Sequence, residues 1–269
     1  MPRRLLQQLG TVAFLTCILP VPASAATSGR VRVILVGDST MATRNGYGDA
    51  LCGLFKNDVT CLNLAMNGRS SGSFRAEGRW DQVMRLLRDD AGRRSYVLIQ
   101  FGHNDQPGKP GRSTDLVREF PANMARYVDE VTGAGAIPVL VTPLTRRIFR
   151  DGVPQNDLRP WAEATRRVAN EKKIPLLDLN ADSHAAVAAM GSTEADTLAE
   201  VPPPGKSGAA VAAEPVDNAT VETIVGTPPK FDYTHVGAKG ADFFSRIVAK
   251  ELTQAVPDLA RHLKSNITQ

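Results

Sequence analysis

The chain has 269 residues, of which 42% are hydrophobic and 22% are charged, an ordinary balance for a globular protein with a substantial core. The formal net charge is +4, from 32 basic and 28 acidic residues. This balance argues against nucleic-acid binding, which needs a concentrated basic face. It is mildly compatible with an acidic polymer as substrate.

The first 25 residues have the layout of a secretory signal peptide. Arg3 and Arg4 precede a short apolar core, and Ala23-Ser24-Ala25 provides a small-residue cleavage site. We therefore expect cleavage after Ala25, a secreted or periplasmic protein and one domain over 26–269. Without the two arginines, 30 basic residues face 28 acidic ones, which leaves a net charge of +2. No later segment is apolar enough to span a bilayer, so we expect no membrane attachment after cleavage.

The first strand is predicted at 31–36, where the apolar run VRVILV ends in Gly37-Asp38-Ser39-Thr40. One interpretation is a turn with a helix N-cap, because Asp, Ser and Thr accept hydrogen bonds from free backbone N–H groups. The other is that Ser39 is a nucleophile held at the end of a strand. The two are compatible, since Asp38 can hold the turn by hydrogen bonds while Ser39 faces an open crevice.

Two cysteines remain when Cys17 leaves with the signal peptide. Cys52 falls on the probable first helix and Cys61 in the probable second strand. An oxidising compartment favours a disulfide between them, and two buried free thiols are the alternative. Neither cysteine has a histidine nearby in the sequence, which argues against a cysteine nucleophile.

Short apolar runs alternate with amphipathic segments along the rest of the chain. Further strands are predicted at 59–65, 95–101, 137–142 and 174–179, and helices at 80–90, 116–135, 158–173 and 238–256. Because the strands are almost continuously apolar, we expect them to be parallel and covered on both faces. The sequence therefore predicts a single-domain three-layer α/β/α sandwich with a five-stranded parallel sheet.

Residues 183–230 interrupt this alternation. A helix is expected at 184–200, and a Pro/Ala-rich surface loop follows at about 200–230. His184 opens this region and is interpreted as a surface residue. Asn218 and Asn266 lie in glycosylation sequons.

Small polar residues follow several predicted strands at the edge where doubly wound folds bind their ligands. Gly68 comes after the second strand, and His103, Asn104 and Asp105 come after the third. Gly68 could be only a turn residue and Asn104 only a cap. We interpret Asp105 as structural.

The chemistry that fits these residues is acyl transfer. A serine hydroxyl needs a base, and His235 is favoured because Asp232, three residues earlier, can orient its ring. His103 is a competing base. The N–H groups of Ser39 and Gly68 and the amide of Asn104 could then stabilise an oxyanion. Asp232 and His235 could instead be only a surface pair before the last helix.

The motifs GDST, GHND and DYTH, with a glycine after the second strand, resemble the sequence blocks of the SGNH hydrolases, also called the GDSL family. The longer stretches GRSSGSFRAEGRW, LIQFGHNDQ, IPVLVTPLTRRIF and DYTHVGAKGA are similar to its rhamnogalacturonan acetylesterase branch. The similarity covers about 31–182 and resumes at about 230.

This resemblance implies a flavodoxin-like fold and hydrolysis of acetyl esters on pectic polysaccharide, without a metal or cofactor. It implies Ser39 as nucleophile, Asp232 and His235 as its partners, and Gly68 and Asn104 as oxyanion donors.

The sequence departs from the branch at two places. Gly72 stands where the branch often has a basic residue, which puts pectin specificity in question, and the 200–230 loop is longer than expected. Arg146 and Arg147 follow the fourth strand at the same edge. One of them, with His103, could contact the substrate sugar, for example a galacturonate carboxylate. Alternatively, the arginines form a salt bridge to a neighbouring loop.

The leading hypothesis is a secreted, monomeric carbohydrate O-acetylesterase acting on an acetylated polysaccharide or oligosaccharide. An acetylxylan esterase, a general short-chain esterase and a lipase or thioester hydrolase on the same fold are alternatives. The aromatic content of 6% argues weakly against a deep acyl-chain pocket. A non-catalytic carbohydrate-binding protein and a flavodoxin-like nucleotide-binding protein are further alternatives, and both leave the Ser39, Asp232 and His235 pattern unexplained.

Overall fold

The computed structural model describes residues 31–202 and 231–265. The expected signal peptide, most of the 200–230 loop and the two sequons at Asn218 and Asn266 lie outside the described residues. Within the described part of the chain, no helix is long and apolar enough to cross a membrane.

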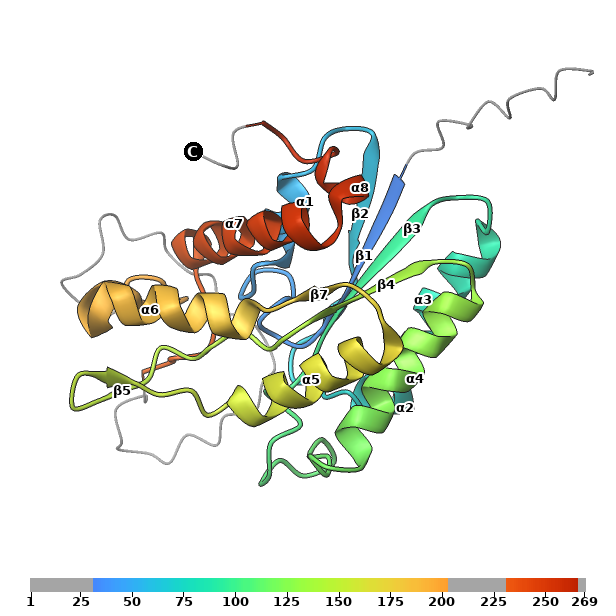
Figure 1. The fold of residues 1–269 in the computed structure, drawn as a ribbon. Helices are drawn as coiled ribbons and strands as arrows, with labels where there is room; N and C mark the ends of the chain where they lie inside the picture. Colours follow the sequence, from blue (N-terminus) through green and yellow to red (C-terminus); the bar gives the residue numbers. More distant parts are fainter. Residues whose placement is uncertain (1–30, 203–230, 266–269) are drawn as a thin grey trace, which may run out of the picture.

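A five-stranded parallel sheet forms the centre of the molecule, which confirms the predicted fold class (Figure 1). Its strands are β1 (Val31–Gly37), β2 (Val59–Asn63), β3 (Ser95–Gln100), β4 (Ile137–Val141) and β7 (Leu176–Leu177). Their spatial order is β2-β1-β3-β4-β7, the order of flavodoxin-like sheets. The carboxyl ends of β1, β2 and β3 therefore lie side by side, which brings the residues that follow them to one edge.

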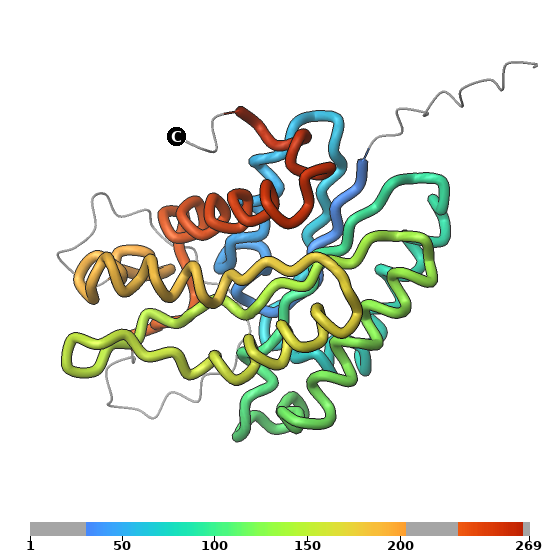
Figure 2. The backbone as a smooth tube through the Cα atoms, viewed as in Figure 1, coloured from blue at the N-terminus to red at the C-terminus, as the bar shows by residue number. Residues whose placement is uncertain are grey.

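Helices cover both faces of the sheet (Figure 1). One face carries α1 (Gly48–Gly53), α6 (Leu179–Asp196), α7 (Ala238–Ala255) and α8 (Pro257–Ala260), and the other carries α2 (Ser73–Ala76), α3 (Arg79–Asp89), α4 (Glu119–Gly133) and α5 (Arg159–Lys172). In Figure 2, α7 near the end of the chain runs beside α1 near its start. The segment before α7 is thereby brought to the same side of the molecule as the loop after β1.

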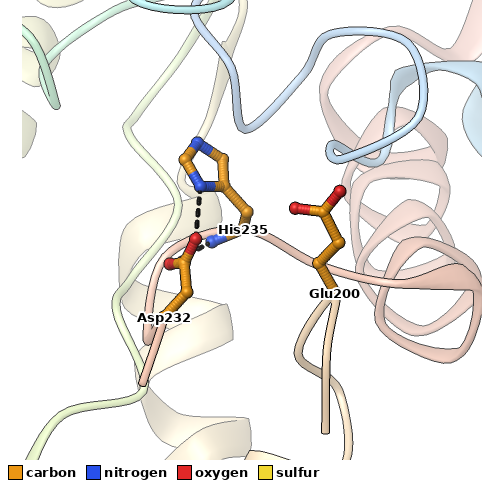
Figure 3. Close-up of side chains that lie close together, drawn as sticks. All are labelled: Glu200, Asp232 and His235. Atoms are coloured by element: carbon orange, nitrogen blue, oxygen red, sulfur yellow. Dashed lines mark hydrogen bonds and ion pairs between the residues drawn. The ribbon is translucent and has the colours of Figure 1, made fainter. Parts of the chain in front are cut away.

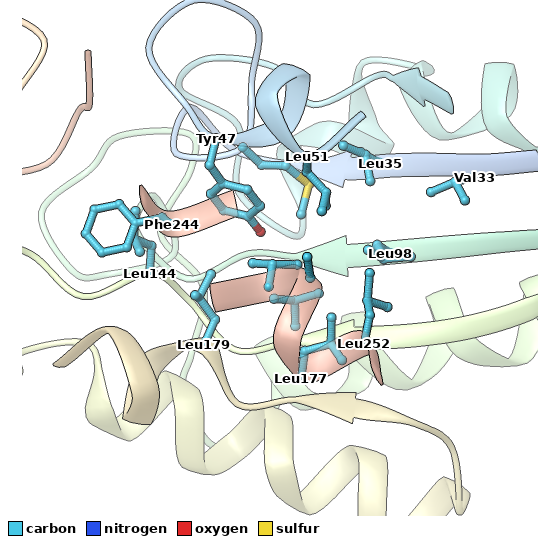
Figure 4. Close-up of a cluster of buried hydrophobic side chains, with 14 of the residues drawn as sticks. Val33, Leu35, Tyr47, Leu51, Leu98, Leu144, Leu177, Leu179, Phe244 and Leu252 are labelled. Carbon is cyan, nitrogen blue, oxygen red and sulfur yellow. The ribbon is translucent and has the colours of Figure 1, made fainter. Parts of the chain in front are cut away.

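The pleat of the strands divides the core into two apolar clusters. In β1, Val33 and Leu35 pack with Leu51 and Phe244 on one face (Figure 4), whereas Ile34 and Val36 pack on the other. This alternation of side chains across a fully covered sheet explains why the strands read as continuous apolar runs.

The structure differs from the predicted elements in a few places. The helix expected at 184–200 begins at Leu179, and Gly191, with φ 73°, interrupts its helical backbone. The strand expected at 174–179 is reduced to two residues because α6 starts directly after it. The short helix α2 and the hairpin of β5 (Phe149–Arg150) and β6 (Val153–Pro154) were not predicted. An Asp-Gly turn joins the two hairpin strands, but two-residue strands are too short to show a period.

A disulfide joins Cys52 on α1 to Cys61 on β2, with their Cα atoms 5.4 Å apart. The two cysteines are thus a bonded pair rather than two free thiols. The bond ties the first helix to the edge strand of the sheet.

Glu251 on α7 is a buried carboxylic acid. It is 8% exposed, and neither carboxyl oxygen has a hydrogen-bond partner within the described residues. Burial, together with the nearby carboxylates of Asp182 and Asp178, raises the pKa of Glu251 to about 9. A carboxyl group with a raised folded-state pKa stabilises the fold least at high pH, because the unfolded chain releases the proton more readily.

We therefore expect stability to be lost as the pH rises from the unfolded-state pKa of Glu251 toward about 9. The variant Glu251→Gln keeps the shape and cannot ionise, so its melting temperature should exceed that of the wild type by several degrees at pH 8 and by less at pH 5. Thermal unfolding at the two pH values measures this difference. An equal difference at both values would show that Glu251 does not titrate in this range.

Candidate active site

The turn after β1 is held by Asp38. Its Oδ1 atom accepts hydrogen bonds from the Thr40 backbone N–H at 2.9 Å and from Thr40 Oγ1 at 2.8 Å. This is the structural role that the sequence predicted for Asp38. Ser39, between them, is 6% exposed at the carboxyl end of β1. Gly37 is required just before the turn, because a Cβ atom there would lie 2.7 Å from the Gln100 carbonyl oxygen.

A buried network of hydrogen bonds supports the turn after β1. Tyr47 Oη donates to Gln100 Oε1 at 2.6 Å, and Gln100 Nε2 donates to Thr40 Oγ1 at 2.6 Å. A satisfied buried polar network fixes the groups that it joins. The network was not predicted from the sequence, although Gln100 is a polar residue at the end of an otherwise apolar strand.

His103 lies beneath the turn, beside Asp38. Its Nδ1 atom is 3.4 Å from Asp38 Oδ2, within ion-pair range but without hydrogen-bond geometry. Burial lowers the pKa of His103, although Asp38 opposes this effect. Burial alone would raise the pKa of Asp38, but His103 and Thr40 bring it below its usual value. Since His103 is only 2% exposed, the structure does not support the predicted sugar contact for this residue.

Two hydrogen bonds hold the segments that carry Gly68 and Asn104 beside the turn. The Met66 N–H donates to the Gly37 carbonyl at 3.0 Å, and Asn104 Nδ2 donates to the Arg69 carbonyl at 3.1 Å. Gly68, between these anchored residues, has φ +76°, a conformation that favours glycine. The three expected oxyanion donors therefore belong to neighbouring segments at one edge of the sheet.

Asp105 has the structural role that the sequence predicted. It is buried and accepts hydrogen bonds from Ser71 Oγ at 2.6 Å and from Thr114 Oγ1 at 2.9 Å. Burial raises its pKa to about 6. The residue joins the segment after Gly68 to the loop that leads to α4.

Asp232 and His235 form a hydrogen-bonded pair (Figure 3). Asp232 Oδ2 lies 2.6 Å from His235 Nδ1, and Asp232 Oδ1 accepts the backbone N–H groups of Thr234 at 2.7 Å and His235 at 3.0 Å. Burial would lower the pKa of His235, but the Asp232 hydrogen bond and charge outweigh it and raise the value above the usual one. The same pair lowers the pKa of Asp232, against the effect of burial.

Backbone contacts hold this pair at the edge that carries Ser39. The Val236 N–H donates to the carbonyl of Asn45, in the loop after β1, at 3.0 Å. The negative charge of Asp38 also contributes to the raised pKa of His235. In Figure 3 the Nε2 atom of His235 points away from Asp232, so it is available to a second partner. Ser39 Oγ makes no hydrogen bond within the described residues, as is common before substrate binds.

Comparisons with known proteins agree with this geometry. The model of the GDSL-like lipase/acylhydrolase family matches residues 35–201. The chain belongs to this family. It is therefore an ester hydrolase, as the sequence predicted.

Two relatives from Bacillus subtilis (strain 168) confirm the predicted branch. The chain is 30% identical over 243 residues to the rhamnogalacturonan acetylesterase RhgT, a match that covers 87% of this chain and 95% of RhgT. It is 27% identical over 229 residues to the probable rhamnogalacturonan acetylesterase YesY, with coverage of 82% and 92%.

Solved structures support the fold. The acetylxylan esterase Axe2 of Geobacillus stearothermophilus, solved as a catalytic mutant, matches with a TM-score of 0.58 at 16% identity, over 83% of this chain and 94% of Axe2. A Bacillus subtilis protein matches with a TM-score of 0.63 at 20% identity, over 84% of this chain. The present chain spans only 57% of that Bacillus subtilis protein.

Glu200 is a neighbour of the histidine that sequence reasoning missed. Glu200, Asp232 and His235 each offer one ligand atom within 4.8 Å of the others, a set that could hold a metal ion (Figure 3). A metal there would compete with the bond between Asp232 and His235. The negative charge of Glu200 also raises the pKa of His235. The residue stands in the segment expected to be a surface loop, where no sequence pattern distinguishes it.

Arg147 of the esterase is fully buried, so the predicted sugar contact is wrong for this residue. Its Nη2 atom donates to the carbonyl oxygens of Asp232 at 3.0 Å and His235 at 2.7 Å, and its backbone N–H donates to the carbonyl of Tyr233 at 3.0 Å. Burial lowers the pKa of Arg147 to about 10, so it stays charged at neutral pH. Arg147 is a positioning residue for the segment that carries His235.

Arg146 also contacts protein groups. Its guanidinium forms an ion pair with Asp157 and donates to Gln106 Oε1 at 2.9 Å and to Thr234 Oγ1 at 3.1 Å. The alternative interpretation, a structural salt bridge to a neighbouring loop, therefore describes Arg146.

Replacing Arg147 with methionine should loosen the His235 segment. The variant keeps the volume but removes the guanidinium that donates to the carbonyls of Asp232, Thr234 and His235, so we expect a stability loss of about 3 kcal/mol and a fall in kcat of about tenfold or more. Thermal unfolding and ester hydrolysis well below the melting temperature measure the two effects. Arg159→Met, at an exposed ion pair on α5, is the matched control. An Arg147→Met enzyme with wild-type kcat would show that the guanidinium does not position His235.

Proposed function

We propose that this esterase is an exported carbohydrate O-acetylesterase that releases acetate from acetylated rhamnogalacturonan, with Ser39, His235 and Asp232 as its catalytic triad. The two relatives named for this reaction support a carbohydrate acetylesterase. The observation that carries the proposal is the Asp232–His235 pair, anchored to the loop after Ser39.

The reaction begins when Ser39 Oγ attacks the acetyl carbonyl carbon and His235 Nε2 takes the hydroxyl proton. Asp232 stabilises the resulting imidazolium through Nδ1. The N–H groups of Ser39 and Gly68 and the Asn104 amide donate to the oxyanion.

The tetrahedral intermediate then collapses, and the sugar oxygen leaves with the proton from His235. A water molecule, deprotonated by His235, attacks the acetyl-enzyme. The second tetrahedral intermediate releases acetate and restores the hydroxyl of Ser39.

The surface beside the site offers groups that can bind a sugar. One hollow of about 310 Å³ combines the polar side chains of Arg44, Asn63, Asn67 and Gln82 with apolar ones that include Phe74 and Met66. Amide and guanidinium groups can bind sugar hydroxyls, whereas a fatty acyl chain needs an apolar tunnel.

The test is a panel of acetate-release assays with the purified enzyme. We expect the highest kcat/KM on acetylated rhamnogalacturonan, a lower value on acetylated xylan, and a decline from acetyl to longer p-nitrophenyl esters. A preference for xylan would favour the acetylxylan esterase, and a preference for long acyl chains would favour a lipase. Sugar binding without acetate release would favour the non-catalytic protein.

Export and oligomeric state are tested separately. Expression of the full chain, followed by mass spectrometry of the mature N-terminus, should give a protein that begins after Ala25. An unprocessed N-terminus would contradict export. Gel filtration should give a monomer.

A further inference from the structure

The loop between β3 and α4 carries two cations without a partner in 31–202 or 231–265. The guanidinium of Arg112 is exposed, and it makes neither a hydrogen bond nor an ion pair with those residues. The ammonium of Lys109, which is half-buried, is also unpaired there. Arg146, by contrast, is fully engaged by Asp157 and Gln106.

Arg112 lies beside the proposed oxyanion site. Its Nη1 atom is 3.3 Å from the position that a Cβ atom on Gly68 would occupy. The guanidinium therefore lies against the bare Cα atom of Gly68. A substrate whose acetyl oxygen reaches the Gly68 N–H would bring its neighbouring groups close to Arg112.

The same arginine lines a hollow large enough for a sugar unit. The hollow has a volume of about 500 Å³, and Gly72, Ser73, Thr114 and Asn123 also line it. Hydroxyl and amide side chains can bind sugar hydroxyls, and a guanidinium binds a carboxylate with two parallel hydrogen bonds. Gly72 offers no side chain to this hollow, and Arg112 supplies a positive charge to it from another segment.

Like charges crowd this loop. Burial lowers the pKa of Lys109, and the positive charges of Arg146 and Arg112 lower it further, against the opposing effect of Asp38 and Asp105. Repulsion from the neighbouring guanidinium groups disfavours the charged form of Lys109. An anion bound from outside would relieve that repulsion.

We propose that Arg112, assisted by Lys109, binds the carboxylate of a uronic acid unit next to the acetylated sugar, with that unit in the hollow between α2 and the start of α4. This inference rests on the proposed function, because it names the anionic sugar that the same site selects. It replaces the sequence-based expectation that Arg146 or Arg147 fills this role.

The test compares two versions of one substrate. Acetylated rhamnogalacturonan oligosaccharides are assayed as they are and after chemical reduction of their carboxylates to alcohols. In Arg112→Gln the ratio of kcat/KM on the acidic to the reduced substrate should fall about tenfold, chiefly through KM, and further in the double variant with Lys109→Gln. The control Arg159→Gln, at an exposed ion pair on α5, should keep the wild-type ratio. An equal loss on both substrates, or no loss, would overturn the inference.

A binding experiment separates this inference from the proposed function. Calorimetry with Ser39→Ala and non-acetylated acidic oligosaccharides should show binding that weakens with salt and with Arg112→Gln, and weaker binding of neutral xylo-oligosaccharides. If the wild type releases no acetate from pectic substrate but this binding is seen, the proposed function fails and the carboxylate site stands. Absence of preferential binding of the acidic oligosaccharides would overturn the site.

Discussion

The Ser39→Ala variant should lose about four to six orders of magnitude in kcat on p-nitrophenyl acetate and on acetylated oligosaccharide. Without the hydroxyl, no acetyl-enzyme forms, and only binding and the oxyanion donors remain to assist direct attack by water. The side chain is small and makes no hydrogen bond with the described residues, so its removal should leave the melting temperature within about 2 °C of the wild type.

The matched control is Ser192→Ala, on α6. Ser192 is exposed, and its hydroxyl makes no hydrogen bond with the described residues. We expect this variant to keep at least half of the wild-type activity. A Ser39→Ala enzyme that turns over at a comparable rate would remove Ser39 from the role of nucleophile.

The Asp232→Asn variant should have the second largest effect, a loss of about two to four orders of magnitude in kcat. An amide can keep hydrogen bonds to the backbone but cannot stabilise the imidazolium with a negative charge. Asparagine can also present its N–H to Nδ1, which would turn the ring into the wrong tautomer. Asp242→Asn, at an exposed ion pair with Arg246 on α7, is the control for a lost surface carboxylate.

The pH profile of the same variant gives an independent test. His235 must be neutral to accept a proton, so kcat/KM of the wild type should rise with pH through the raised pKa of His235. Asp232→Asn removes the carboxylate whose hydrogen bond and charge contribute most to raising the pKa of His235. Burial then lowers this pKa. The acidic limb should therefore move to lower pH while the plateau falls. If the acidic limb of the kcat/KM profile does not move, a group other than His235 must be responsible for it.

The residues at the strand ends could be predicted because parallel strands bring their carboxyl ends to one edge. Ser39, Gly68 and Asn104 were predicted as site residues because they follow strands. The pairing of Asp232 with His235 was predicted from their three-residue spacing. The structural role of Asp38 was predicted because a short carboxylate near a turn binds local backbone groups, whereas the structural role of Asp105 comes from Ser71 and Thr114 in other segments.

The roles of the basic residues could not be predicted in this way. Arg146 and Arg147 are adjacent, and the sequence does not show which guanidinium turns inward, because the carbonyls that Arg147 binds lie some 85 residues later in the chain. Arg112 stands in a loop without periodicity, and only the folded chain places it beside Gly68.

The most direct measurement of the central claim is capture of the acetyl-enzyme. Rapid acid quench of the wild type during turnover of p-nitrophenyl acetate, followed by mass spectrometry of proteolytic peptides, should find one acetyl group on the peptide that contains Ser39. The Asp232→Asn enzyme should accumulate it to a different extent, and Ser39→Ala should show none. An acetyl group on another side chain, or full turnover with no modified Ser39 in any quench, would contradict the account.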